Sequence, residues 1–143
     1  MALAWSREWM DAQQARCRAD ELFNDDADGF DRFFVMHVLA DPDSGVPQDR
    51  WVGFNPPQLD DFWVAEENLR PDSDYVVRGT YADWWAINEG RKGLVASLLD
   101  QSIELIKGNT SYIAMFVGGA DRFYEISRSV TTAYEGDYTS SAS

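Results

Sequence analysis

The acidic segment at residues 24–29 comes closer than any other to the spacing of a metal site. Asn24, Asp26, Asp28 and Gly29 occupy the first, third, fifth and sixth places of a calcium-binding loop. The twelfth place requires a bidentate glutamate but holds Val35, and an apolar strand pattern stands where the exiting helix should begin. The segment therefore indicates an acidic turn, and we expect no bound metal and no cofactor.

The chain has a single histidine, His37, and a single cysteine, Cys17. These two residues cannot form a zinc site, and no nucleophile elbow accompanies the histidine. We expect His37 to be hydrogen-bonded in a core or pocket, and Cys17 to be a small packed residue. Adjacent carboxylates such as Asp60 and Asp61 point to opposite faces of a strand, so we interpret most acidic residues as a solvated surface.

The charge balance excludes several classes of partner. The sequence has 25 acidic and 12 basic residues, giving a net charge of −13. Phosphate backbones and anionic lipid surfaces are repelled by such a field, so we expect no nucleic-acid binding and no stable membrane binding. A single cysteine, and the absence of any apolar run of about 18 residues, favour a cytoplasmic protein.

Apolar segments alternate with turn-forming residues in the first half of the chain. Apolar residues spaced three and four apart predict an amphipathic helix over residues 6–24, capped by Ser6. Short connections predict an antiparallel meander of four strands, and a fifth strand lies near residues 103–107. The four meander strands are expected at residues 31–40, 50–55, 62–68 and 74–80. We expect one domain over residues 1–134 and a flexible polar tail at residues 135–143.

The second half of the chain predicts three helices. Thr80 and Asp83 form a capping box for a helix over residues 81–89, and a further helical turn or two follows at residues 93–101. One long apolar helix is expected over residues 110–134. Its glycines, Gly118 and Gly119, cost about 1 kcal/mol each relative to alanine, so we expect residues 110–130 to form a movable wall of a cavity.

Six tryptophans and eight phenylalanines exceed what a small core needs, although an ordinary core is the alternative interpretation. We expect Phe62, Trp63 and aromatic residues of the later helices to face the same side of the sheet and to line an apolar pocket. One or two polar groups, such as His37, Tyr112 or Tyr124, would orient a ligand there. The candidate ligand-binding residues are His37, Trp63, Trp84, Trp85, Leu98, Tyr112, Met115, Phe116, Phe123 and Ile126.

Residues 75–109, YVVRGTYADWWAINEGRKGLVASLLDQSIELIKGN, resemble the sterol carrier protein type 2 family. They share that family's order of a strand, a short helix ending in glycine, a second helix, and a strand ending in Gly-Asn before the last helix. The resemblance implies an α+β fold in which a five-stranded, largely antiparallel sheet is covered on one face by helices around an apolar tunnel. It also implies binding of sterols or fatty acyl compounds without catalysis.

Three functions are compatible with this sequence. The first is non-catalytic binding or shuttling of a hydrophobic small molecule of the sterol, fatty acyl or polyketide type. The second is an enzyme, or an accessory to a pathway enzyme, in which Asp83, His37 or a tyrosine acts as acid or base on a steroid- or polyketide-like substrate. The third is a structural subunit that docks on a partner enzyme through an exposed aromatic patch.

Overall fold

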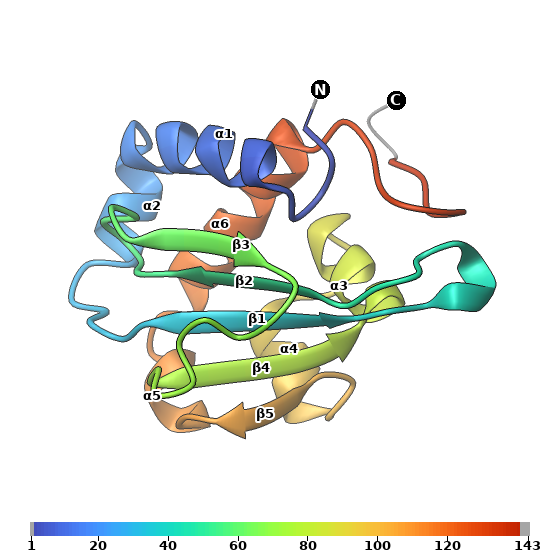
Figure 1. The fold of residues 1–143 in the computed structure, drawn as a ribbon. Coiled ribbons are helices and arrows are strands. Elements are labelled where there is room, and N and C mark those ends of the chain that lie inside the picture. Colours follow the sequence, from blue (N-terminus) through green and yellow to red (C-terminus); the bar gives the residue numbers. More distant parts are fainter. Residues whose placement is uncertain (1, 141–143) are drawn as a thin grey trace.

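The computed structural model describes residues 2–140, which form an α+β fold with a five-stranded sheet and helices on one of its faces (Figure 1). The strand order is β3-β2-β1-β4-β5. Three of the four neighbouring pairs are antiparallel, and β1 and β4 are parallel. The strands are β1 (Phe34–Leu39), β2 (Arg50–Phe54), β3 (Phe62–Ala65), β4 (Tyr75–Thr80) and β5 (Glu104–Lys107).

The expected four-strand meander is wrong at its last step. β4 does not pair with β3 but crosses to the other side of β1, where Phe34 lies opposite Tyr75. The crossing is fixed at its start, because the Tyr75 amide donates to the Phe33 carbonyl at 3.0 Å and the Phe33 amide donates to the Asp74 carboxylate at 2.9 Å. Most residues of β1 and β4 are buried, and the parallel pairing places these two strands between β2 and β5.

The helix expected over residues 6–24 is two helices, α1 (Arg7–Arg18) and α2 (Glu21–Asp26). Ser6 caps α1 as predicted. Asp20 caps α2 by accepting a hydrogen bond from the Phe23 amide at 2.7 Å. The same carboxylate pairs with Arg122 at 2.5 Å, so an aspartate that breaks the first helix also joins α2 to the last one.

The capping box of Thr80 and Asp83 is confirmed at the start of α3 (Tyr81–Asn88), which α4 (Leu94–Leu99) follows. The long closing helix is also divided, into α5 (Thr110–Ala114) and α6 (Val117–Val130). The break places Gly118 and Gly119 in the first turn of α6, and the expectation that they weaken the middle of a helix is wrong. A short 3₁₀ helix, η1 (Pro42–Ser44), lies between β1 and β2.

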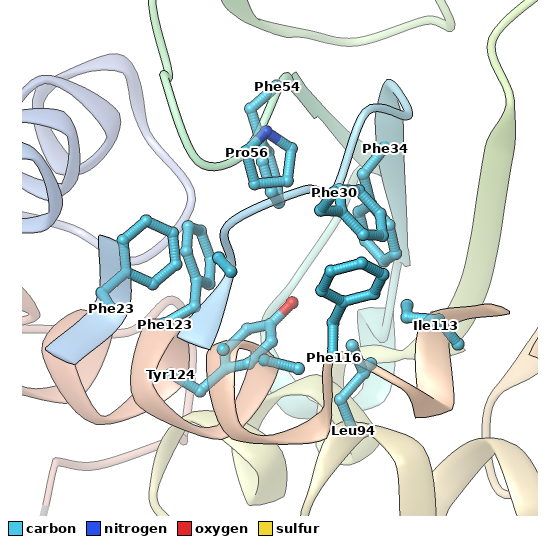
Figure 2. Close-up of a pocket in the computed structure, with 13 residues that line it drawn as sticks. Phe23, Phe30, Phe34, Phe54, Pro56, Leu94, Ile113, Phe116, Phe123 and Tyr124 are labelled. Atoms are coloured by element: carbon cyan, nitrogen blue, oxygen red, sulfur yellow. The ribbon is translucent and has the colours of Figure 1, made fainter. Parts of the chain in front are cut away.

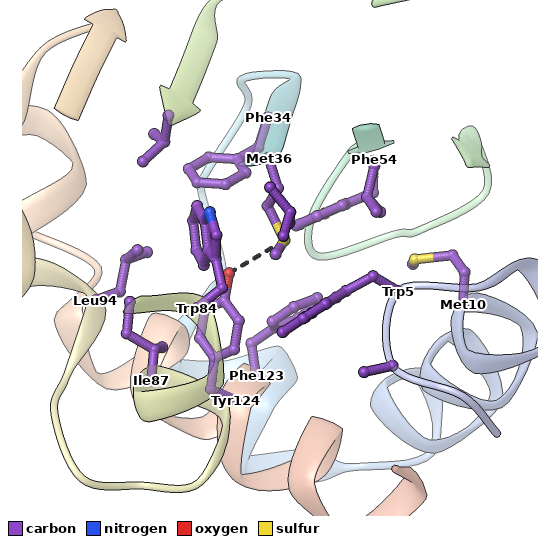
Figure 3. Close-up of a cluster of buried hydrophobic side chains, with 14 of the residues drawn as sticks. Trp5, Met10, Phe34, Met36, Phe54, Trp84, Ile87, Leu94, Phe123 and Tyr124 are labelled. Atoms are coloured by element: carbon purple, nitrogen blue, oxygen red, sulfur yellow. Dashed lines mark hydrogen bonds between the residues drawn. The ribbon is translucent and has the colours of Figure 1, made fainter. Parts of the chain in front are cut away.

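The main core fills the space between the sheet and the helices (Figure 3). Its largest fully buried side chains include Trp5, Trp9 and Trp84. A smaller cluster of Phe33, Val35 and Val76 lies on the opposite face of the sheet. The helical face is therefore the one where a buried ligand site can form.

The end of the described chain packs on α3. The Tyr138 ring lies 4.8 Å from that of Tyr81, and its hydroxyl donates to Asp41 at 2.6 Å. The Trp85 indole donates to the Thr139 carbonyl at 2.9 Å. Residues 141–143 of the expected tail lie outside the described residues, and the domain division at residue 134 stays a prediction.

Candidate functional site

An apolar cavity of about 50 Å³ lies between α6 and the sheet (Figure 2). Side chains from both ends of the chain converge on it, from α2 and the loop after it to α5 and α6. Its lining contains Phe23, Ala27, Phe30, Phe34, Phe54, Pro56, Leu94, Ile113, Phe116, Gly119, Ala120, Phe123 and Tyr124. Ligand pockets for small molecules usually measure about 300 to 1,000 Å³, so this cavity must widen before it can hold one.

Stacked rings form the inner wall of the cavity. The Phe123 ring stacks on the Phe54 ring with centroids 4.9 Å apart and planes 12° apart. Phe54 in turn lies opposite Phe34 across the β1–β2 pair, with ring centroids 5.4 Å apart. These three buried rings belong to α6 and to two neighbouring strands of the sheet, β1 and β2.

The outer wall consists of the break between α5 and α6. Phe116 turns inward there and meets the Phe30 ring edge-on, with centroids 5.2 Å apart. The two residues that flank it point away from the core, since Met115 is 75% exposed and Val117 is 44% exposed. A half-buried ring between two exposed residues makes this break a candidate entrance to the cavity.

Close backbone packing holds the start of α6 against α2. A β-carbon added to Gly119 would lie 3.0 Å from the β-carbon of Ala27 and 3.1 Å from its backbone nitrogen. A β-carbon on Gly118 would meet only the flexible Asp26 carboxylate, at 3.1 Å. Gly119 is therefore required for the approach of the two helices, whereas Gly118 is not.

Tyr124 is the titratable side chain among the described residues that line the apolar cavity. Its hydroxyl donates to the Met36 sulfur at 3.4 Å, the contact drawn as a dashed line in Figure 3. Burial raises the pKa of this hydroxyl, which is therefore neutral at physiological pH. A neutral phenol bonded to a thioether is a poor acid or base.

A second, polar cavity of about 310 Å³ adjoins the first. The loop between α3 and α4 forms one side of it, and α6 forms the other. It shares Leu94 and Tyr124 with the apolar cavity, so these two side chains separate the two spaces. The remaining lining residues are Ile87, Gly90, Lys92, Gly93, Asp121, Glu125 and Arg128.

Of the residues predicted from the sequence, Phe116 and Phe123 line the apolar cavity. Tyr112 lies behind it, with its ring 5.3 Å from that of Phe116 and 5.6 Å from that of Phe30. Met115 lies at the outer rim. Trp84, Trp85, Leu98 and Ile126 belong to the surrounding core and do not line the cavity.

His37 and Trp63 lie on the opposite face of the sheet from the helices. The His37 ring stacks on Trp51 at 3.5 Å, and its Nε2 is 2.8 Å from the Asp49 carboxylate, which confirms a hydrogen-bonded histidine. Trp63 covers Gly53 in the neighbouring strand. The expectation that Phe62 and Trp63 face the same side is wrong, because side chains alternate along a strand and only Phe62 packs with the main core.

The part of the apolar cavity that lies outside residues 110–130 was not predicted from the sequence. Phe34 and Phe54 lie opposite one another on the helical face, but β1 has apolar residues on both faces, so alternation alone does not identify that face. Phe23 lies at the start of α2, whose separate existence was not predicted. Phe30 lies in the loop after Gly29, and no periodic pattern marks it.

The acidic segment at residues 24–29 has a structural role. The Asn24 side chain donates to the carbonyls of Cys17 and Asp20, at 3.0 and 2.7 Å, and so joins the end of α1 to α2. Within residues 2–140, no group of three or more His, Cys, Asp or Glu side chains is arranged to hold a metal. None of the helices described is both long and apolar enough to cross a membrane.

Similarity to known proteins is found in structure and not in sequence. No family model and no curated protein sequence matches the chain. A crystal structure of sterol carrier protein 2 superimposes with a TM-score of 0.76 at 21% identity, covering 87% of this chain and 96% of the other. A conserved hypothetical protein of Thermus thermophilus, described as possibly a sterol carrier protein, gives 0.78 at 21% identity and covers 89% of each chain.

A third similar structure is that of palmitated SCP2L2 from Aedes aegypti. Its TM-score is 0.53 at 18% identity, and the match covers 78% of this chain and 91% of the other. Together with the five-stranded sheet covered on one face by helices, these comparisons show that the chain has the sterol carrier protein 2 fold.

Proposed function

We propose that this protein binds and shuttles a hydrophobic small molecule in the space between α6 and the sheet, without catalysing a reaction. The observation that carries the proposal is the apolar cavity enclosed by Phe54, Phe123 and Phe116. The palmitated state of the structurally similar Aedes aegypti protein supports a lipid-like ligand of the fatty acyl or sterol type.

The size of the cavity implies that it opens on binding. A space of about 50 Å³ is several-fold too small for a lipid chain, whereas the Phe116 ring and the exposed Met115 lie at a break between two helices. Outward movement of α5 and Phe116 would enlarge the cavity and leave the inner wall of Phe54 and Phe123 in place. A pathway enzyme that supplies or receives the ligand would meet the molecule at this break.

The position of the candidate catalytic groups favours binding over catalysis. His37 lies on the far side of the sheet and pairs with Asp49, and Asp83 is engaged in the capping box of α3. Tyr124, which does line the cavity, is kept neutral by burial, which raises its pKa. The arrangement of these groups therefore supports non-catalytic binding more than acid–base catalysis.

A cytoplasmic location and the lack of stable membrane binding stay predictions.

The experiment is a fluorescence titration with pyrene, a neutral apolar probe without a head group. Parent protein should bind it at one site. Ala120→Leu extends a side chain into the cavity and should weaken binding at least about tenfold, which corresponds to about 1.4 kcal/mol. The matched control is Ala96→Leu, an exposed position on α4. Absence of pyrene binding to the parent, or equal binding by both variants, contradicts the proposal.

A further inference from the structure

The polar cavity beside the apolar one has no role in the function proposed above. It lies across Leu94 and the Tyr124 ring from the apolar space, and both residues line both cavities. The Tyr124 hydroxyl points away from the polar side, toward Met36 in the sheet. The wall between the two cavities thus consists of the Leu94 side chain and the Tyr124 ring.

Leu94 is placed to open this wall. It is the first residue of α4, and the connection before it contains Gly90, which has a positive φ of 76°, and Gly93. Glycines lower the cost of changing the backbone in so short a connection. A small shift of Leu94 would make the two cavities continuous and give a space with one apolar end and one polar end.

The charges around the polar cavity cancel. Two cations, Lys92 and Arg128, face two anions, Asp121 and Glu125. Lys92 pairs with Asp100 and donates to the Ser102 hydroxyl at 3.1 Å, so its charge is already compensated. A charged head group would therefore gain no net attraction here, and the net charge of −13 on the whole chain repels an anion.

Hydrogen-bonding groups are nevertheless available. Within the described residues 2–140, the Asp121 carboxylate makes no hydrogen bond or ion pair, so it can accept a hydrogen bond from a ligand. Arg128 donates from Nη1 to the Glu89 carbonyl at 3.0 Å, and its guanidinium carries further N–H groups. One acceptor and one donor at the same cavity suit a hydroxyl, which can both donate and accept.

We propose that the polar cavity receives the uncharged, hydrogen-bonding head group of an amphipathic ligand whose apolar part lies between α6 and the sheet. The ligand class is then a long-chain alcohol or a related neutral amphiphile, and not a fatty acid anion. This inference rests on the proposed function, because the head-group site has meaning only if the apolar cavity is occupied.

The experiment measures displacement of bound pyrene by dodecanol and by dodecanoate. Dodecanol should compete at a concentration lower by about tenfold or more, since the anion meets no net positive charge. Gly93→Leu places a side chain toward Asp121, in the polar cavity, and should weaken dodecanol binding at least about fivefold while pyrene binding changes by less than about twofold. Gly93→Ser is the matched control, because it caps α4 and stays small.

Asp121→Leu provides a second variant at an exposed position, where a loss of folding is not expected. It should also weaken dodecanol binding and spare pyrene binding, whereas Asp121→Asn should retain most of the alcohol affinity. Equal affinities of Gly93→Leu, Asp121→Leu and the parent protein for dodecanol overturn the head-group site. Tighter binding of dodecanoate than of dodecanol overturns the inference that the head group is uncharged. Either result can occur while pyrene still binds, which leaves the proposed function standing; failure of pyrene to bind overturns both.

Discussion

The ring of Phe116 meets the ring of Phe30 edge-on at 5.2 Å, with an angle of 86° between their planes, at the point where α5 ends and α6 begins. Phe116 joins the break between these two helices to the body of the protein, and Phe30 comes from the loop before β1. Since both rings line the apolar cavity, separation of this one pair would open it.

Phe123→Ala and Phe116→Ala should differ in their effects. Phe123 is 4% exposed and stacks on Phe54, so its loss should cost about 3 to 5 kcal/mol of unfolding free energy. Phe116 is only half-buried, and its loss should cost about 1 kcal/mol while accelerating entry and release of pyrene. Chemical denaturation and stopped-flow fluorescence provide the two readouts, with the exposed Met115→Ala as control. Equal losses of stability in Phe123→Ala and Phe116→Ala, together with unchanged rates of pyrene entry and release in Phe116→Ala, would show that Phe116 does not control access to the cavity.

Gly119→Ala should destabilise the protein, whereas Gly118→Ala should not. The added methyl group at Gly119 would press on the backbone of Ala27, which cannot move without displacing α2, and overpacking of this kind costs about 1 to 3 kcal/mol. At Gly118 the methyl group meets the Asp26 carboxylate, which can rotate away, so the higher helix propensity of alanine should leave stability unchanged or raise it by up to about 1 kcal/mol. Thermal unfolding of the two variants tests this, and a stable Gly119→Ala protein would contradict the close packing of α2 on α6.

Ionisation of the Asp121 carboxyl should lower the free energy of unfolding as the pH rises. Desolvation by neighbouring side chains, and secondarily the charge of Glu125, raise the pKa of this carboxyl above its ordinary value of 3.8. The folded protein therefore holds this proton more tightly than the unfolded chain does, so the associated stability is present below pH 3.8 and is lost as the pH rises through the folded pKa. Asp121→Asn should exceed the parent in unfolding free energy at neutral pH, and the difference should vanish in acid. A lower stability of Asp121→Asn at neutral pH would mean that the carboxylate is stabilised in the folded state.

The sequence predicted the parts of this fold that depend on local signals. The capping residues Ser6 and Thr80 mark the starts of α1 and α3, and the apolar strands were all found. The position of β4 beside β1 was not predicted, because a turn-rich connection allows a crossover as readily as a hairpin. The start of α2 at Asp20 was missed although its capping bond to the Phe23 amide is local, whereas the start of α6 at Phe116 has no side-chain cap to mark it.

The candidate site was predictable only in part for the same reason. Phe116 and Phe123 lie on the closing helical segment, where helical spacing identifies the buried side. Phe30 is brought to the cavity by a loop, and no spacing rule applies to it. His37 was misplaced with respect to the cavity because apolar residues occupy both faces of β1, so the sequence of that strand does not reveal which face the helices cover.

Amide hydrogen exchange with and without saturating pyrene tests most directly whether a hydrophobic ligand enters beneath the break between α5 and α6. We expect altered exchange at residues 113–120 and in the cavity-lining part of α6. Exchange should change little around Trp51 and Trp63, on the face of the sheet opposite the helices. Altered exchange confined to Trp51, Trp63 and their neighbours, or saturable binding with no change at residues 113–120, would contradict entry at this break.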